Sequence, residues 1–116
     1  MTASEMDEVI VMEPQGELYE GAECDEMERR LFAQVERGAR VVVDVSATRH
    51  LSARCLGIFA RAHQLATQHG GCVVLCGANR DHRWLLETTG LAEALPFFED
   101  VAAAIRDLRD RRRAVA

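Results

Sequence analysis

The chain has 116 residues, of which 48% are hydrophobic and 28% charged, and this fits one globular domain with a core of its own. The composition argues against intrinsic disorder, and no apolar stretch approaches the roughly 20 residues that a membrane span needs. No apolar signal segment follows Met1, so we expect a cytoplasmic protein.

The charged residues exclude several classes of chemistry. All 14 basic residues are Arg, and the absence of Lys excludes Walker-type phosphate binding and Schiff-base or PLP chemistry. Residues 1–28 carry a net charge of −10, whereas the remainder carries +5. Such an acidic N-terminal quarter disfavours a nucleic-acid partner, and the basic run 109–113 is expected to be a solvated helix end.

The first third of the chain predicts strands followed by a helix. Residues 1–8 are polar and are expected to form a loose segment, whereas 9–12 is an apolar strand and 17–19 a second short one. The apolar spacing then becomes helical over 22–37. One stripe of this helix carries Cys24, Met27, Leu31 and Val35.

The middle of the chain repeats the strand–helix order. Residues 41–43 are a continuous apolar strand closed by Asp44, and a helix is expected over 52–69 with Ser52 as its N-cap. Gly70 and Gly71 end that helix before the strand 72–76. The apolar stripe of the helix is Cys55, Phe59, Ala62 and Ala66.

The last third predicts a short helix that Asn79 caps and that runs to Thr88, an edge strand within 95–98 and a helix capped by Asp100. Trp84 on the short helix is interpreted as a core or semi-core lid over the sheet edge, the favoured reading, or as an exposed anchor for a partner. We therefore predict an α/β fold with a mixed, mostly parallel sheet of four or five strands and about four helices. The domain is expected over 9–108, with 109–116 as an Arg-rich helix end or tail.

The four cysteines are best interpreted as small buried hydrophobic residues. Cys72 and Cys76 lie about 13 Å apart if both belong to one strand, too far for both to ligate one zinc ion. Cys24 and Cys55 fall on apolar helix stripes. No ligand spacing relates His63, His69 and His82 on one element, so we expect no metal and no cofactor.

Two patterns could suggest an enzyme or a ligand-binding α/β domain. Cys55 lies in the first turn of a predicted helix, where a thiol pKa can fall, and His50 is five residues earlier. The position of Cys55 on the apolar stripe argues against such a nucleophile. Asp44 ends a strand as a receiver-domain acceptor would, with Glu13 near the first strand's end, but the Lys of that site is missing.

Three stretches lie in an order and at spacings that a known family shares. They are Gly16-Glu17-Leu18 with Ala22, then Val42-Val43-Asp44-Val45-Ser46 with Leu51 and Gly57, then Thr89-Gly90-Leu91 with Pro96-Phe97-Phe98 and Val101-Ala102-Ala103-Ala104-Ile105. Over about residues 9–108 the chain resembles the STAS domain of bacterial anti-sigma factor antagonists. That family typically reads Gly-Glu-Leu-Asp and Val-Val-Asp-Leu-Ser at the first two stretches.

The chain departs from this family in its phosphorylation motif. Where the family typically reads Asp-Ser-Ser-Gly-Leu-Gly, this sequence has Ser52-Ala53-Arg54-Cys55-Leu56-Gly57. The phosphate-accepting Ser of the family falls on Ala53, which has no hydroxyl. Ser52, Ser46 and Thr48 could act as substitutes, although a helix N-cap and turn formers are the simpler roles.

The resemblance implies that, in the family, a kinase adds phosphate at the N-terminus of this helix. That phosphate would add negative charge to the surface that docks a partner. Ala53 and Arg54 could simply be a helix former and a solvated side chain, or they could mark a binding face that is no longer switched. Gly57 inside a helix costs about 1 kcal/mol against Ala, so close core packing or a partner's backbone should compensate.

The resemblance implies a non-enzymatic regulatory module that binds another protein, in this family typically an anti-sigma factor of the serine-kinase type. Two alternatives within the fold are a stressosome-type scaffold and the STAS subunit of a lipid-transport ATPase complex. We expect the partner surface at the loop 46–51 and the start of the following helix, where Arg49, His50 and Arg54 place positive charge around Ser52. Whether the chain forms a homodimer is left open.

Overall fold

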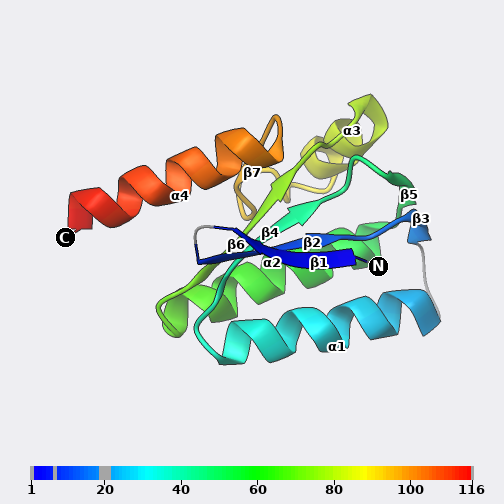
Figure 1. Ribbon diagram of the computed structural model, residues 1–116. Coiled ribbons are helices and arrows are strands. Elements are labelled where there is room, and N and C mark those ends of the chain that lie inside the picture. Colours follow the sequence, from blue (N-terminus) through cyan, green and yellow to red (C-terminus); the bar gives the residue numbers. More distant parts are fainter. Residues whose placement is uncertain (1, 7, 19–21, 116) are drawn as a thin grey trace.

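Strands and helices alternate along most of the chain, as the sequence predicts (Figure 1). The computed structural model describes residues 2–6, 8–18 and 22–115. Within these residues the elements are β1 (Thr2–Met6), β2 (Val9–Glu13), β3 (Gly16–Leu18), α1 (Ala22–Glu36), β4 (Arg40–Asp44), β5 (Thr48–Leu51), α2 (Ala53–Gln68), β6 (Cys72–Cys76), α3 (Arg80–Thr88), β7 (Phe97–Phe98) and α4 (Val101–Val115).

Five strands form one mixed sheet in the order β1-β2-β4-β6-β7. The pair β1–β2 is antiparallel, and the other three pairs are parallel. At the centre, Val42 of β4 lies between Val11 and Val74 of the neighbouring strands. The predicted fold class, a mostly parallel sheet with four helices, is therefore confirmed for the described residues.

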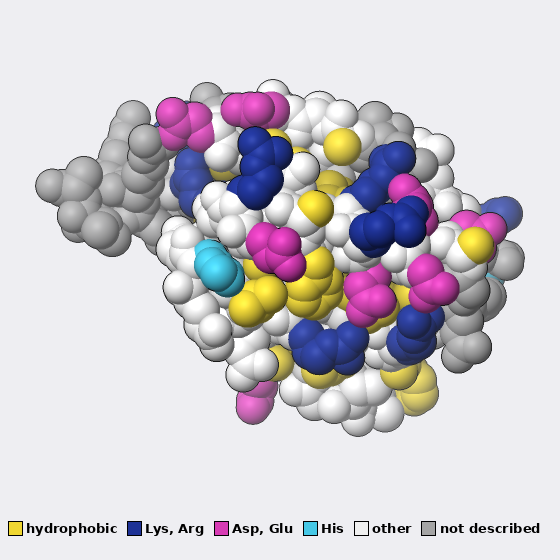
Figure 2. Space-filling model, turned by 90° about the horizontal axis from the view of Figure 1, so that it is seen from below, with side chains coloured by type: hydrophobic (Ala, Val, Ile, Leu, Met, Phe, Trp, Pro, Cys, Tyr) yellow, Lys and Arg dark blue, Asp and Glu magenta, His cyan; other side chains and the backbone are white. Residues whose placement is uncertain are grey.

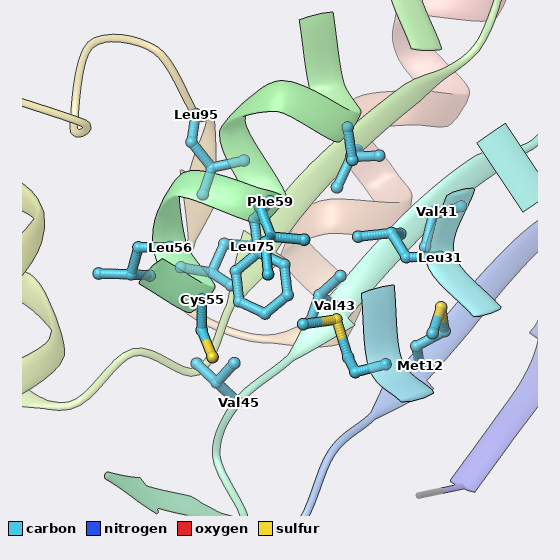
Figure 3. Packing of buried hydrophobic residues seen from close by; sticks show 14 of the residues in the cluster. Met12, Leu31, Val41, Val43, Val45, Cys55, Leu56, Phe59, Leu75 and Leu95 are labelled. Atoms are coloured by element: carbon cyan, nitrogen blue, oxygen red, sulfur yellow. The ribbon is translucent and has the colours of Figure 1, made fainter. Parts of the chain in front are cut away.

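Helices cover both faces of this sheet, α1 and α2 on one side and α4 on the other (Figure 1). Side chains alternate between the faces along a strand, so Val41 and Val43 join the core with α1 and α2, whereas Val42 packs with α4. This is why residues 41–43 of β4 form an unbroken apolar run. In Figure 3, Phe59 of α2 lies between Leu75 and Val43 on the larger side of the core.

Two segments that the sequence predicted as irregular are strands. The segment 1–8, expected to be loose, contains β1. This strand pairs with one edge of β2, whose other edge pairs with β4. The expected loop 46–51 contains β5, which pairs in parallel with β3 in a separate two-stranded sheet. Both strands are short and lack an apolar alternation, so their pairing comes from tertiary contacts rather than from local pattern. Tyr19, the end of the predicted strand 17–19, lies outside the described residues.

The helix boundaries follow the predicted caps. Ser52 and Asn79 are the N-caps of α2 and α3, and Asp100 accepts a hydrogen bond from the N–H of Ala103 at the start of α4 (2.8 Å). α4 continues to Val115, so the backbone of the Arg-rich end is helical. None of the helices within the described residues has the length and apolar character needed to cross a membrane.

The favoured expectation for Trp84, a place in or near the core, is wrong. Its side chain is 64% exposed, because α3 buries His82 and Leu86 instead. Residue 84 is two positions from each of them, about 200° around the helix, and so points into solvent. Figure 1 shows α3 beside β5 at one end of the molecule.

Candidate functional site

The path from β4 to α2 is fixed by a tight turn around Asp44. The N–H of Ser46 donates to Asp44 Oδ1 (3.0 Å), and the N–H of Thr48 donates to the carbonyl of Val45 (3.0 Å). Gly77 lies against this turn at a φ of 73°, where an added Cβ would stand 2.6 Å from Asp44 Oδ1. Asp44 therefore stabilises a turn. This structural role accounts for an Asp at the end of β4 without a receiver-type phosphoacceptor site.

Strand β5 is buried at both ends and exposed in the middle. Thr48 and Leu51 are buried, and the Thr48 hydroxyl donates to the carbonyl of Pro14 (2.6 Å). Arg49 and His50 between them are exposed. This anchoring presents two cationic or ionisable side chains at the surface, directly before α2.

Ser52 caps α2, as the sequence predicts. Its Oγ accepts the N–H of Cys55 (3.1 Å), and its carbonyl accepts the N–H of Leu56 (3.2 Å). Leu51 and Leu56, whose positions on either side of this cap match a hydrophobic staple, are both buried in the core. Of the alternative acceptors, Thr48 is buried, whereas Ser46 is exposed.

Ala53 and Arg54 form the exposed start of α2. Arg54 Nη2 donates to Asp25 Oδ1 of α1 (3.0 Å), and this hydrogen bond raises the pKa of Arg54. Basic and acidic side chains intermingle on this face of the molecule (Figure 2). The pair Arg61–Glu28 also joins α2 to α1 (3.3 Å). The acid opposite Arg54 could not be found from neighbours in sequence, because it comes from another helix.

The thiol of Cys55 is buried completely and is 2.9 Å from the Sγ of Cys24 on α1. Burial, together with the hydrogen bond to Cys55, raises the pKa of Cys24 to about 12. His50, in contrast, is exposed on β5. This arrangement disfavours an accessible Cys55–His50 nucleophile.

Gly57 does not meet the expectation of close core packing. A Cβ added there would have no heavy atom within 4 Å. The residue instead opens onto a surface groove between α2 and the segment after α3, which is also lined by Ala60, Arg61, His63, Gln64, Thr67, Leu91 and Ala94. Packing in the core therefore does not require a Gly at this position.

Sequence reasoning missed the part that α3 plays at this site. His82 is buried, its Nδ1 accepts the N–H of Asn79 (3.2 Å), and Asn79 Oδ1 accepts the N–H of His82 (2.8 Å). Burial lowers the pKa of His82, and the nearby backbone of Arg49 and Thr48 offsets this only in part. The spacing of Asn79 and His82 matches a capping box and could have revealed the pairing.

Within the described residues, no group of three or more His, Cys, Asp or Glu side chains could hold a metal ion. His63, one of the candidate histidines, accepts a hydrogen bond from the N–H of Val73 through its Nδ1 (3.2 Å).

The family model of the STAS domain matches residues 1–104 of the chain. A search of curated proteins found no match. Among solved structures, a candidate anti-sigma factor antagonist from Thermotoga maritima superposes with a TM-score of 0.82 at 16% identity, covering 93% of each chain.

Two further structures are similar. SpoIIAA, a cell fate determinant of Bacillus, in its unphosphorylated form gives a TM-score of 0.78 at 13% identity, covering 94% of this chain and 96% of that one. A variant of RsbS from Moorella thermoacetica gives 0.80 at 16% identity, covering 97% of each chain. At such low identity these likenesses establish the fold.

Proposed function

Because the chain belongs to the STAS domain family, we propose that it is a non-enzymatic module that binds another protein, as an anti-sigma factor antagonist does. The observation that carries this proposal is the geometry of β5. Thr48 and Leu51 anchor the strand, so that Arg49 and His50 project beside the capped N-terminus of α2. The surface formed by Arg49, His50, Ser52 and Arg54 is called the β5–α2 surface below.

The charge of the β5–α2 surface favours an acidic partner. Within this surface, Arg54 is paired with Asp25. Arg49 does not take part in that ion pair and contributes the second positive charge. The positive end of the α2 dipole adds to the attraction. An anti-sigma factor of the serine-kinase type is the partner class that the family favours.

We propose that this surface lacks the serine phosphoswitch. SpoIIAA has been solved in unphosphorylated and phosphorylated forms, so its fold accommodates both states. Here Ala53 occupies the exposed first position of α2, and its side chain offers no oxygen to a kinase. The surface should therefore attract its partner constantly.

The test is binding to individually purified anti-sigma factors of the serine-kinase type from the same organism, measured by calorimetry. We expect one of them to bind, and Arg49→Asp to weaken that binding at least tenfold, with a clear dependence on salt. Arg106→Asp is the matched control, since it reverses an exposed charge on α4.

Binding that survives Arg49→Asp, or that falls equally with Arg106→Asp, would contradict the proposed surface. Failure of every such factor to bind, together with self-assembly of the chain into a large particle, would favour the scaffold alternative instead.

A further inference from the structure

Two cysteines from different helices meet in the core next to the β5–α2 surface. Cys24 is the third residue of α1 and Cys55 the third residue of α2. Their sulfur atoms are 2.9 Å apart, and both side chains are completely buried. A disulfide bond is about 2.05 Å long, so only a small approach separates these thiols from bonding distance.

The two helices hold this pair in place through contacts that flank it. Asp25 and Arg54, each adjacent in sequence to one of the cysteines, form an ion pair at the surface. Arg61 and Glu28 join the same helices further along. The sulfur atoms therefore face each other across a fixed helix–helix interface rather than from mobile loops.

We propose that Cys24 and Cys55 form a redox-sensitive pair that closes to an intramolecular disulfide when the protein meets a hydroperoxide. One thiolate attacks the peroxide, the O–O bond breaks, and the sulfur becomes a sulfenic acid while the other oxygen leaves as water or an alcohol. The second sulfur then attacks the first, so that the S–S bond forms and the S–O bond breaks. The hydroxyl leaves as water, and the two thiols have lost two electrons to the peroxide.

Burial sets the conditions for this reaction. Because burial raises the pKa of Cys24 to about 12, the closed protein holds this thiol protonated and away from oxidants. Both cysteines lie in the first turn of a helix, where local opening is easiest. The pair should therefore react slowly and report sustained oxidation, and the bridge would tie the first turn of α2 to α1.

The other two cysteines provide an internal control. Cys72 and Cys76 are the two ends of one strand, about 13 Å apart, so they cannot bridge each other. Burial also raises the pKa of Cys76 to about 12. A link between Cys24 and Cys55 alone would therefore follow from geometry and not from general thiol reactivity.

The test is oxidation of the reduced, folded chain with hydrogen peroxide, followed by thiol counting and peptide mapping. We expect the free thiols to fall from four to two, with one linked peptide pair containing Cys24 and Cys55. The bridge should raise the melting temperature by about 10 °C, reversibly with a dithiol reductant. A variant with Cys72→Ser and Cys76→Ser should behave in the same way, and Cys24→Ala should lose both the link and the thermal shift.

Four free thiols after a treatment that oxidises the urea-unfolded chain would overturn the proposal. So would a link through Cys72 or Cys76, or one between two chains. If Cys24→Ala does not fold, Cys55→Ala serves the same purpose, and the mapping of the parent chain decides the matter without either variant. The mass measurement needs no binding partner, so its outcome is independent of the proposed function.

Discussion

Arg54 at the start of α2 donates a hydrogen bond to Asp25 of α1, with 3.0 Å between Nη2 and Oδ1. The pair is exposed on both sides, and such pairs contribute little to stability. The ion pair matters instead because it changes the charge of the β5–α2 surface. Asp25 neutralises much of the charge of Arg54, so a partner must compete with α1 for this guanidinium.

Replacing Arg54 by Asp tests whether this position lies in the interface. The change removes the ion pair and places an acid beside Asp25, yet an acid is favoured in the first turn of a helix. We expect the melting temperature to change by only a few degrees, while affinity for an acidic partner falls roughly tenfold and becomes less sensitive to salt. Thermal unfolding and calorimetry measure the two effects.

Arg61→Asp is the matched control for this variant. Arg61 is exposed on the same helix and pairs with Glu28 of α1, seven residues further along. If both variants weaken binding to the same degree, the effect comes from net charge and the β5–α2 surface is wrong.

Ala53 lies at the phosphoacceptor position of the family, so we predict that the parent chain is not phosphorylated there. A serine kinase related to the anti-sigma factors, together with ATP, should leave the mass of the parent chain unchanged. Ala53→Ser restores a hydroxyl at an exposed position and should allow one phosphate to be added. Fragmentation mass spectrometry locates the phosphate. Modification of Ser52 in the parent chain would show that the acceptor has moved by one residue.

The strands and helices with strong apolar patterns could be predicted from the sequence. The unbroken run in β4 and the stripe on α2 follow from burial on one or two faces, and the N-cap of α2 follows from Ser52. β1 and β5 could not be predicted, because their formation depends on an open edge of β2 and on β3.

The site was predictable in outline but not in its contacts. Arg49, His50 and Ser52 are adjacent in sequence, so their grouping was foreseeable. The contacts of Arg54 with Asp25 and of Cys55 with Cys24 depend on how α1 docks on α2, which no local pattern encodes. Trp84 was misplaced because hydrophobicity alone does not say which side of a short helix faces the core.

Ser52→Ala should destabilise the protein by about 1 kcal/mol, because it removes the oxygen that accepts the N–H of Cys55. Ser52→Asp should retain most of the stability, since Asp is an equally good N-cap. Urea unfolding of the three proteins measures the difference. Equal losses in both variants would mean that Ser52 stabilises the fold through something other than its cap.

Gly57→Ala tests the conclusion that this Gly is not required by packing. An added Cβ meets no heavy atom within 4 Å, and Ala is the better helix former by about 1 kcal/mol. We therefore expect unfolding in urea to require more denaturant. A loss of stability would restore the core-packing interpretation, whereas a gain of stability with weaker partner binding would place the partner in the groove beside Gly57.

The buried side chain of His82 should make the free energy of unfolding depend on pH. Burial lowers its pKa below the ordinary 6.5, despite Asp81 nearby, which opposes the change, whereas His50 adds to it. Below pH 6.5 the unfolded chain therefore takes up a proton before the folded one does, and stability falls as the pH drops toward the folded pKa. Protonation would also remove the Nδ1 acceptor that serves the N–H of Asn79.

The variant His82→Gln isolates this effect, because Gln can reach back to the N-cap from the same position and does not titrate. We expect its free energy of unfolding, measured in urea between about pH 7.5 and 5, to decline less steeply than that of the parent chain. His69→Gln is the control, since His69 is exposed at the end of α2 and should leave the slope unchanged. If His82→Gln and the parent lose stability in parallel, another group governs the acid limb and α3 does not depend on a neutral His82.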